Sequence, residues 1–247
     1  MTKLDKHYTD PRLVAIYDIE NPRGIDTDFY LALADELNAK RIIDLGCGTG
    51  LLTCEFVTSE REVIGIDPSS AMLAVAKQQA NAEKVTWIEG DASAIGQAQA
   101  DLLVMTGNVA QIFLDDDEWL SALQSIHSGL RSGGYLVFEV RNPKARGWEQ
   151  WNKTDSYFKF DSPHGTMETW VKVTGIQGNL VHFEGHNVFL DKGDTIIVES
   201  TLRFRSHEEI STFLADVGFT VEHVYGDWKR GALQDNSRTM VFIARRN

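Results

Sequence analysis

Short apolar runs alternate with helical patterns over the first 140 residues of the 247-residue chain. Mostly apolar runs predict strands at residues 41–45, 62–67, 85–91, 101–105 and 135–140. A helical face is predicted within residues 69–80, formed by Met72, Val75, Ala76 and Ala80. A second is predicted within residues 115–130, formed by Trp119, Leu123, Ile126 and Leu130. This alternation is typical of a parallel sheet covered by helices, so we expect a doubly wound α/β fold up to residue 140.

The pattern changes after residue 140. Residues 166–205 contain three runs of alternating apolar and polar side chains, typical of antiparallel strands. In the second run, Val181 and Phe183 face away from His182, Glu184 and His186. We therefore expect a small antiparallel sheet inserted here.

The last segment returns to a helix followed by two strands. Ser206 and Glu209 have the spacing of a capping box, and Gly218 is placed to end the helix. Residues 219–227 and 238–246 then predict two strands that rejoin the main sheet.

Composition narrows the class of protein. Hydrophobic residues make up 43% of the chain, enough for a sizeable core. No apolar stretch approaches the ~18 residues of a membrane span, and the start "MTKLDKHYTD" lacks the order of a signal peptide. We therefore expect a cytoplasmic protein without a membrane partner. The two cysteines, Cys47 and Cys54, form no metal or disulfide pattern and agree with a reducing compartment.

The charge argues against a polyanionic partner. Twenty-four Lys and Arg against 36 Asp and Glu give 24 − 36 = −12. Net repulsion opposes binding to DNA or large RNA, and the single dense basic run, at residues 244–247, is short. We therefore expect no nucleic-acid partner.

The stretch "RIIDLGCGTGLLTCEF", residues 41–56, carries the strongest sequence signal for a ligand. A dinucleotide fingerprint would need a third glycine where Leu51 stands, and a phosphate-binding P-loop would need a lysine. What remains is a tight strand-to-helix turn whose backbone approaches a ligand closely. Asp67 closes the second strand 21 residues after Gly46, where a carboxylate suits two ribose hydroxyls. The pattern therefore favours a nucleoside without an obligatory phosphate.

Four motifs in order, "DLGCGTG", "VIGIDPSSAML", "EGDA" and "LLVMTGN", resemble those of the class I S-adenosylmethionine-dependent methyltransferases over roughly residues 25–140. The inserted sheet is similar in architecture to glycine and amino-sugar N-methyltransferases. The resemblance implies a mostly parallel, Rossmann-like seven-stranded sheet with an inserted antiparallel sheet. We expect residues 1–140 and 206–247 to form the cofactor-binding domain and residues 141–205 a cap on the substrate side.

The resemblance also implies roles for residues around S-adenosyl-L-methionine. Asp44 would reach the methionine ammonium through water or directly. The turn Gly46, Cys47 and Gly48 would pass under the methionine and ribose, and Asp67 would bind the ribose hydroxyls. The remaining cofactor contacts would be Pro68 and Met72 on the adenine, Asp91 and Ala92 at its edge, Gly107 and Asn108 on the far side, and Tyr17 over the sulfonium. Structural alternatives remain: each of the three aspartates could instead cap a turn or helix, and Tyr17 could pack at the domain edge.

Substrate contacts are expected above the carboxyl ends of the strands, from Tyr17, Gln111, Arg141, Trp148 and Trp151. Arg141 suits an anionic group, but an ion pair with Glu139 on the same strand face is an equal alternative. Tryptophans in such a position are more often packing residues of a lid than substrate contacts. The sequence identifies no catalytic residue.

No metal site is predicted. His182 and His186 share one strand face but lack a third ligand, so a solvated polar face is the simpler interpretation. The run Asp115, Asp116 and Asp117 most simply complements a helix N-terminus.

These observations predict a methyltransferase that transfers a methyl group from S-adenosyl-L-methionine to an N or O atom of a small molecule by direct displacement, leaving S-adenosyl-L-homocysteine. One alternative is a nicotinamide-dependent oxidoreductase on the same kind of sheet, against which Leu51 argues. The other is a non-catalytic protein that binds S-adenosylmethionine. The expected partner is a small-molecule methyl acceptor, and the protein would act as a monomer or homodimer.

Overall fold

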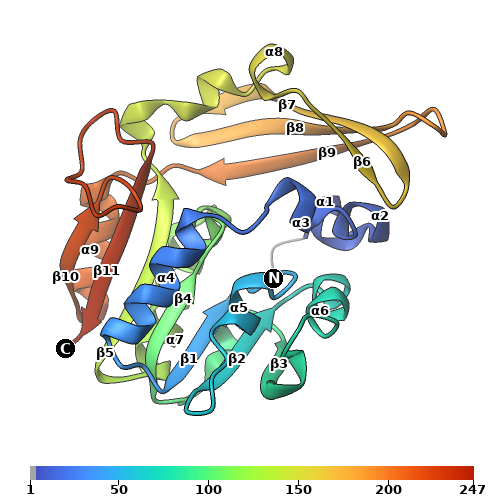
Figure 1. Ribbon diagram of the computed structural model, residues 1–247. Coiled ribbons are helices and arrows are strands. Elements are labelled where there is room, and N and C mark those ends of the chain that lie inside the picture. The colour runs from blue at the N-terminus through green and yellow to red at the C-terminus, as the bar shows by residue number, and fades with distance from the viewer. Residues whose placement is uncertain (1–3) are drawn as a thin grey trace.

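Two β-sheets organise the chain in the computed structural model, which describes residues 4–247 (Figure 1). The strands of the larger sheet are β1 (Arg41–Leu45), β2 (Glu62–Asp67), β3 (Val85–Glu89), β4 (Ala100–Met105), β5 (Leu130–Arg141), β10 (Phe219–Tyr225) and β11 (Thr239–Arg246). They lie in the order β10-β11-β5-β4-β1-β2-β3. The pairs from β5 to β3 are parallel, and β11 runs antiparallel to both its neighbours. The predicted seven-stranded, mostly parallel sheet is confirmed.

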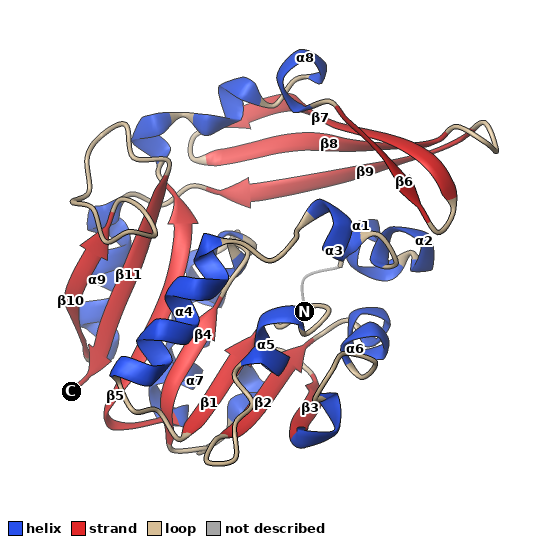
Figure 2. Ribbon diagram, viewed as in Figure 1, coloured by secondary structure: helices blue, strands red, loops and turns tan. Residues whose placement is uncertain are grey.

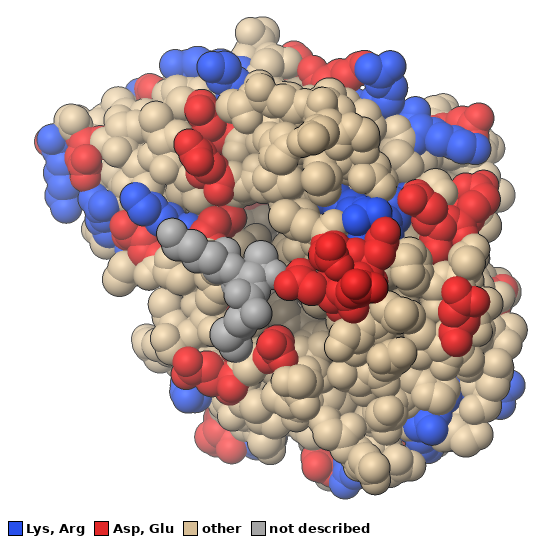
Figure 3. All heavy atoms as spheres, turned by 180° about the vertical axis from the view of Figure 1, so that it is seen from behind, with Lys and Arg blue, Asp and Glu red and all other residues tan. Residues whose placement is uncertain are grey.

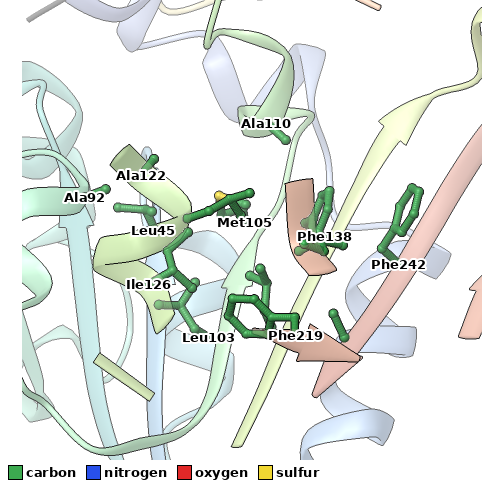
Figure 4. Close-up of a cluster of buried hydrophobic side chains, with 14 of the residues drawn as sticks. Leu45, Ala92, Leu103, Met105, Ala110, Ala122, Ile126, Phe138, Phe219 and Phe242 are labelled. Atoms are coloured by element: carbon green, nitrogen blue, oxygen red, sulfur yellow. The ribbon is translucent and has the colours of Figure 1, made fainter. Parts of the chain in front are cut away.

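Helices cover both faces of this sheet. They are α4 (Ile25–Glu36), α5 (Leu51–Glu55), α6 (Ser70–Ala76), α7 (Asp116–Gly129) and α9 (His207–Val217). The strand period of two divides β4 between two cores: Leu102 and Val104 pack with α4, while Leu103 and Met105 pack with α7 and α9. Figure 4 shows the second cluster, in which Met105 lies near Phe138 from β5. Burial on both faces explains why these strands read as continuous apolar runs.

Helix α7 confirms the predicted apolar face, with Trp119, Leu123 and Ile126 buried. The prediction for residues 69–80 is wrong at its end. Helix α6 stops at Ala76, and Ala80 is exposed outside it. Beyond Ala76 the backbone bonds become i→i−3, from the Gln78 amide to the Val75 carbonyl and from the Gln79 amide to the Ala76 carbonyl, so the last turn is tightened. Five short 3₁₀ helices complete the helical elements of the described chain: Ala82–Lys84, Ala92–Ile95, Val109–Gln111, Pro143–Ala145 and Gly147–Gln150.

The insert is a four-stranded antiparallel sheet above the carboxyl ends of the main strands (Figure 2). Its strands are β6 (Phe158–Ser162), β7 (Gly165–Gln177), β8 (Leu180–Phe189) and β9 (Asp194–Arg203), and α8 (Lys153–Ser156) precedes it. The three predicted alternating runs correspond to β7, β8 and β9, and the alternation in β8 is confirmed. Strand β6 was not predicted, because it is a short edge strand with little burial.

An arginine pair ties the insert to the main domain. Arg203 and Arg205 both bind the carboxylate of Asp116 at the start of α7, and Arg205 also bonds the carbonyl of Phe113. Asp115 caps α7 by accepting from the Asp117 amide, as predicted for this acidic run. The capping box of Ser206 on α9 and the left-handed Gly218 that ends the helix (φ 99°) are also confirmed.

The N-terminal segment lies between the two sheets as three short helices, α1 (Lys6–Thr9), α2 (Pro11–Val14) and α3 (Tyr17–Glu20) (Figure 1). Leu13 and Ile16 pack with Met167, Phe189 and Val198 of the insert into a separate apolar cluster. Within residues 4–247, no helix is both long and apolar enough to cross a bilayer.

Candidate functional site

The glycine loop joins β1 to α5 at the carboxyl edge of the main sheet. Gly46, Gly48 and Gly50 all have left-handed backbones, with φ of 76°, 53° and 74°. At Gly46 a Cβ atom would lie 2.5 Å from Cγ2 of Val109, so only glycine fits. The amides of Gly46 and Cys47 both donate to the carbonyl of Ile66, which locks the loop against the end of β2. The loop is therefore a rigid, backbone-lined surface.

Asp67 ends β2 and faces this loop. Its two oxygens accept from the amides of Gly48 and Ser69, each at 2.8 Å. The side chain is 7% exposed, and burial raises its pKa while these two bonds lower it. Each carboxylate oxygen has a second acceptor position, so Asp67 can hold the loop and still accept from ligand hydroxyls. The turn-capping and ligand-binding interpretations are therefore compatible.

Asp44 is a buried carboxylate with an incomplete set of hydrogen-bond partners among the described residues. It is 1% exposed on β1, where Oδ2 accepts from the hydroxyl of Thr53 at 2.6 Å and Oδ1 has no partner. Burial, with smaller contributions from the negative charges of Asp67 and Glu139, raises the pKa of this carboxyl to about 7, although the bond from Thr53 opposes the rise. A buried acceptor oxygen without a donor is costly, so a cationic donor arriving here would be stabilised.

The predicted adenine side lies at the ends of β2 and β3. Asp91 accepts from the amide and hydroxyl of Ser93 and caps the 3₁₀ helix that begins at Ala92, and these bonds lower its pKa. Ala92 and Met72 are buried, and Pro68 is half-buried. The capping alternative for Asp91 is thus present in the structure, and its remaining acceptor positions are free to meet a ligand.

Gly107 and Asn108 follow β4 with left-handed backbones, φ 69° and 64°. Their turn is held by Glu139, a buried carboxylate on β5 that accepts from the Asn108 amide at 2.6 Å and from the hydroxyl of Tyr30. Burial raises the pKa of Glu139. No ion pair between Glu139 and Arg141 is found among the described residues: the two Glu139 oxygens accept from Tyr30 and Asn108, and the Arg141 side chain donates to Gln111.

The N-terminal segment closes over the loop. The Tyr17 ring lies 3.9 Å from the position of a Cβ on Gly48, and its pKa is raised to about 12 by burial and by the charge of Asp67. Tyr8 lies 6.3 Å from Tyr17 between ring centroids, and its carbonyl accepts from the hydroxyl of Ser69 beside Asp67. Tyr17 is therefore in the site and not at a domain edge.

The predicted substrate residues gather at the end of β5. Arg141 lies over the Trp151 ring at 5.4 Å and donates to Oε1 of Gln111 at 3.3 Å. Gln111, 1% exposed, also accepts from the Arg141 amide and donates to the Arg203 carbonyl. Trp151 packs on Phe183, with 4.9 Å between centroids. Trp148 packs instead on Phe204, 4.6 Å away, and its indole N–H is buried without a partner.

A cavity of about 560 Å³ lies under the insert, and none of the five predicted substrate residues is among its lining residues. Its lining includes Tyr8, Asp5, Ile112, Leu114, Phe183 and Ser200. Asp5 accepts from the Ser200 hydroxyl at 2.6 Å, so the N-terminal segment is fastened to the insert at the cavity wall. The cavity is large enough for a small-molecule acceptor.

The two histidines of β8 have protein partners. His182 bonds Thr201 at 2.8 Å, and His186 bonds Glu184 at 3.0 Å and stacks on Trp170. Throughout the part of the chain that the structure describes, no group of three or more His, Cys, Asp or Glu side chains is placed to hold a metal ion. Cys47 and Cys54 are free and buried.

Comparisons with known proteins agree with this geometry. Residues 42–134 match the family described as "Methyltransferase domain". A Geobacillus sp. (strain WCH70) protein whose name places it among the methyltransferases is 23% identical over 223 residues, covering 84% of this chain and 85% of that protein.

Two solved structures share the fold over most of the chain. The first is an S-adenosylmethionine-dependent methyltransferase from Clostridium acetobutylicum, with a TM-score of 0.76, 17% identity and coverage of 94% and 96% of the two chains. The second is an amino pentose methyltransferase from Micromonospora echinaspora with bound S-adenosylmethionine, with a TM-score of 0.73, 22% identity and coverage of 94% and 97%.

The matched domain, the methyltransferase relative and the shared fold together support a class I S-adenosylmethionine-dependent methyltransferase. Its residues fit the cofactor: the unpartnered Oδ1 of Asp44 suits an ammonium group, and the glycine loop allows close approach of a ligand. The methyltransferase matches argue against the nicotinamide-dependent alternative.

Two residues of the site were missed from the sequence. Tyr8 lies far from every motif and reaches the site only because the N-terminal helices fold between the sheets. From the sequence, Glu139 was named only as a possible partner for Arg141. The signal was that these two residues lie two positions apart and so share one face of a strand. Its actual donors come from α4 and the turn after β4, which the sequence does not place.

Proposed function

We propose that this enzyme transfers a methyl group from S-adenosyl-L-methionine to an N or O atom of a small molecule. The observation that carries the proposal is the unpartnered Oδ1 of Asp44, buried directly before the glycine loop. A carboxyl in this position is unfavourable by itself and becomes favourable when a cationic amine binds.

The described residues supply a complete set of cofactor contacts. Asp44 binds the methionine ammonium, Gly46 to Gly48 with Cys47 line the methionine, Asp67 binds the ribose hydroxyls, and Tyr17 covers the sulfonium. The rest of the contact set is Pro68 and Met72 on the adenine, Asp91 and Ala92 at its edge, and Gly107 and Asn108 on the far side.

When bound, the cofactor would supply a methyl group carried on a positively charged sulfur. The lone pair of the acceptor atom would form the new bond to the methyl carbon, the sulfur would keep the electron pair of the broken carbon–sulfur bond, and the acceptor would release a proton. The protein's part is alignment and exclusion of water. Tyr17 and Tyr8 lie between the loop and the cavity, and we assign to them the exclusion of water from the reacting groups.

The cavity and the surface charge favour a small acceptor. The cavity of about 560 Å³ lies beneath the insert, which limits the size of its occupant. Figure 3 shows a large group of Asp and Glu side chains near the middle of one face, in keeping with the net charge of −12. Both features oppose binding of a nucleic acid. The amino pentose methyltransferase with the same fold acts on a small molecule, which supports this choice.

We assign residues 141–205 to a substrate-side cap and residues 1–140 with 206–247 to the cofactor-binding domain. The cap carries Trp148, Trp151 and the strands that roof the cavity. A cytoplasmic location and a monomeric or homodimeric state stay predictions.

The test is incubation with methyl-labelled S-adenosylmethionine and a small-molecule extract. We expect one equivalent of S-adenosylhomocysteine for each labelled product of low molecular mass. Tight binding of the cofactor with no product above a boiled-enzyme control would instead favour the non-catalytic alternative.

A further inference from the structure

Arg141 is a half-buried cation that forms no ion pair with a carboxylate of the described residues. Among residues 4–247, its side chain donates only to the neutral Oε1 of Gln111, at 3.3 Å. The nearest acidic side chain on its own strand, Glu139, binds Tyr30 and Asn108 instead. Burial lowers the pKa of Arg141, with opposing contributions from Glu139, Tyr8 and Tyr17. A guanidinium remains charged even so, and several of its five N–H donors have no partner in the described chain.

Arg205 is a buried arginine with a structural role, and its partners can be compared with those of Arg141. It is 4% exposed, forms an ion pair with Asp116 at 3.0 Å and fills its other donors with the carbonyls of Phe113 and Asp115. Arg141 has neither a carboxylate nor a comparable set of carbonyls. The nitrogens of Arg141 are not among the buried side-chain atoms without a partner, so its free donors are open to solvent or a ligand. In the described chain no ion pair gives Arg141 a structural role comparable to that of Arg205.

Arg141 does not line the cavity itself, but its neighbours belong to or contact the cavity wall. One face of the guanidinium lies over Trp151, which packs on Phe183 in the cavity wall. Tyr8, also in that wall, is close enough to Arg141 for their charges to interact. Gln111 is a positioning residue. Its side-chain oxygen accepts from the backbone amide and the guanidinium of Arg141, and its side-chain nitrogen donates to the Arg203 carbonyl. These bonds hold the Arg141 guanidinium in place.

We propose that the methyl acceptor carries an anionic group, a carboxylate or a phosphate, which Arg141 binds through its planar fork. This inference rests on the proposed function and names the substrate class for the same site. Bidentate pairing with arginine suits both kinds of anion. The apolar part of the acceptor lies in the cavity against Ile112, Leu114 and Phe183.

The first test sorts acceptors by charge before the reaction. A metabolite extract is separated on an anion exchanger at about pH 8, where carboxylates and phosphates are ionised. Both fractions are then incubated with the enzyme and methyl-labelled S-adenosylmethionine. We expect the labelled product from the retained fraction. Phosphatase treatment of that fraction distinguishes the sources, because it removes a phosphate acceptor and spares a carboxylate. Label only from the unretained fraction would overturn this inference while preserving the proposed function; no labelled small molecule from either would overturn both.

The second test uses Arg141→Gln with the acceptor so identified. We expect KM for the acceptor to rise by about 10- to 150-fold, the effect of one charge-assisted hydrogen bond, while the dissociation constant of S-adenosylhomocysteine changes less than about threefold. Arg141→Lys should recover part of the loss because the charge remains without the fork. Arg146→Gln is the matched control, since Arg146 is exposed and pairs only with Glu149.

An equal loss of acceptor and S-adenosylhomocysteine affinity in Arg141→Gln would assign Arg141 to the carboxylate of the cofactor and refute the proposal. An unchanged KM would refute it as well. If Arg141→Gln does not fold, the charge sorting of the wild-type acceptor still decides the question.

Discussion

Asp44→Asn should make the protein more stable and a poorer binder of its cofactor. In the folded chain the pKa of Asp44 is raised from 3.8 to about 7, chiefly by burial. The folded state therefore binds more protons than the unfolded state between about pH 4 and pH 7, and the contribution of this group to the free energy of unfolding falls as the pH rises through that window. A pKa difference of about three corresponds to about 4 kcal/mol.

Asparagine keeps an acceptor for Thr53 and removes the charge. We therefore expect the free energy of unfolding of Asp44→Asn to exceed that of the wild type at about pH 8 by up to about 4 kcal/mol, and to match it at about pH 4.

The same substitution removes the partner of the cofactor ammonium. The loss of one charge-assisted hydrogen bond, about 1.5 to 3 kcal/mol, weakens binding by about 10- to 150-fold. In the wild type, protonation of Asp44 below its pKa should raise the dissociation constant of S-adenosylhomocysteine about eightfold between about pH 7.5 and pH 6. In Asp44→Asn this pH dependence should vanish.

Urea unfolding at the two pH values and calorimetric titration with S-adenosylhomocysteine measure both effects. Asp235→Asn is the control, because Asp235 is exposed and pairs only with the exposed Lys144; it should change neither quantity. A variant that is less stable at about pH 8 and binds S-adenosylhomocysteine as tightly as the wild type would refute the reasoning, because Asp44 would then be a structural cap.

Three further changes test other parts of the site. Asp67→Ala should weaken S-adenosylhomocysteine binding by roughly a hundredfold to ten-thousandfold, since two charge-assisted hydrogen bonds to the ribose are lost; a loss below about tenfold by calorimetry would remove the ribose assignment. Gly46→Ala should destabilise the fold by about 1 to 3 kcal/mol through its left-handed φ and the contact with Val109, whereas Gly147→Ala, with no atom near its Cβ, should be neutral in thermal unfolding. Hydrogen exchange with S-adenosylhomocysteine should show added protection around Tyr17 and in residues 166–205 as well as in the glycine loop; protection confined to the loop and Asp67 would mean that these segments do not cover the site.

Much of the fold could be predicted because local pattern and tertiary environment agree. The central strands of the main sheet are buried on both faces, so β1, β2 and β4 read as apolar runs. The capping box at Ser206 marks the start of α9 correctly. Where burial is weak the sequence carries little information. Strand β6 is an exposed edge, and α6 ends at Ala76 although the apolar spacing continues to Ala80.

For the site, motif order indicated the loop and Asp67, because both belong to one strand-turn-helix unit and its neighbour. Contacts formed by distant segments could not be foreseen. Tyr8 reaches the site from the N-terminal segment. Glu139 accepts from Tyr30 of α4, so whether Glu139 or another group would pair with Arg141 depended on tertiary contacts that the sequence does not show.

The central claim is that the glycine loop, Asp44 and Asp67 hold S-adenosylmethionine beneath Tyr17. A crystal structure with S-adenosylhomocysteine tests it most directly. We predict the ligand's ammonium within hydrogen-bond distance of the Oδ1 atom of Asp44 that now has no partner, and both ribose hydroxyls on the Asp67 carboxylate. A ligand bound elsewhere, or bound at the loop with Asp44 Oδ1 still unpartnered, would contradict this account.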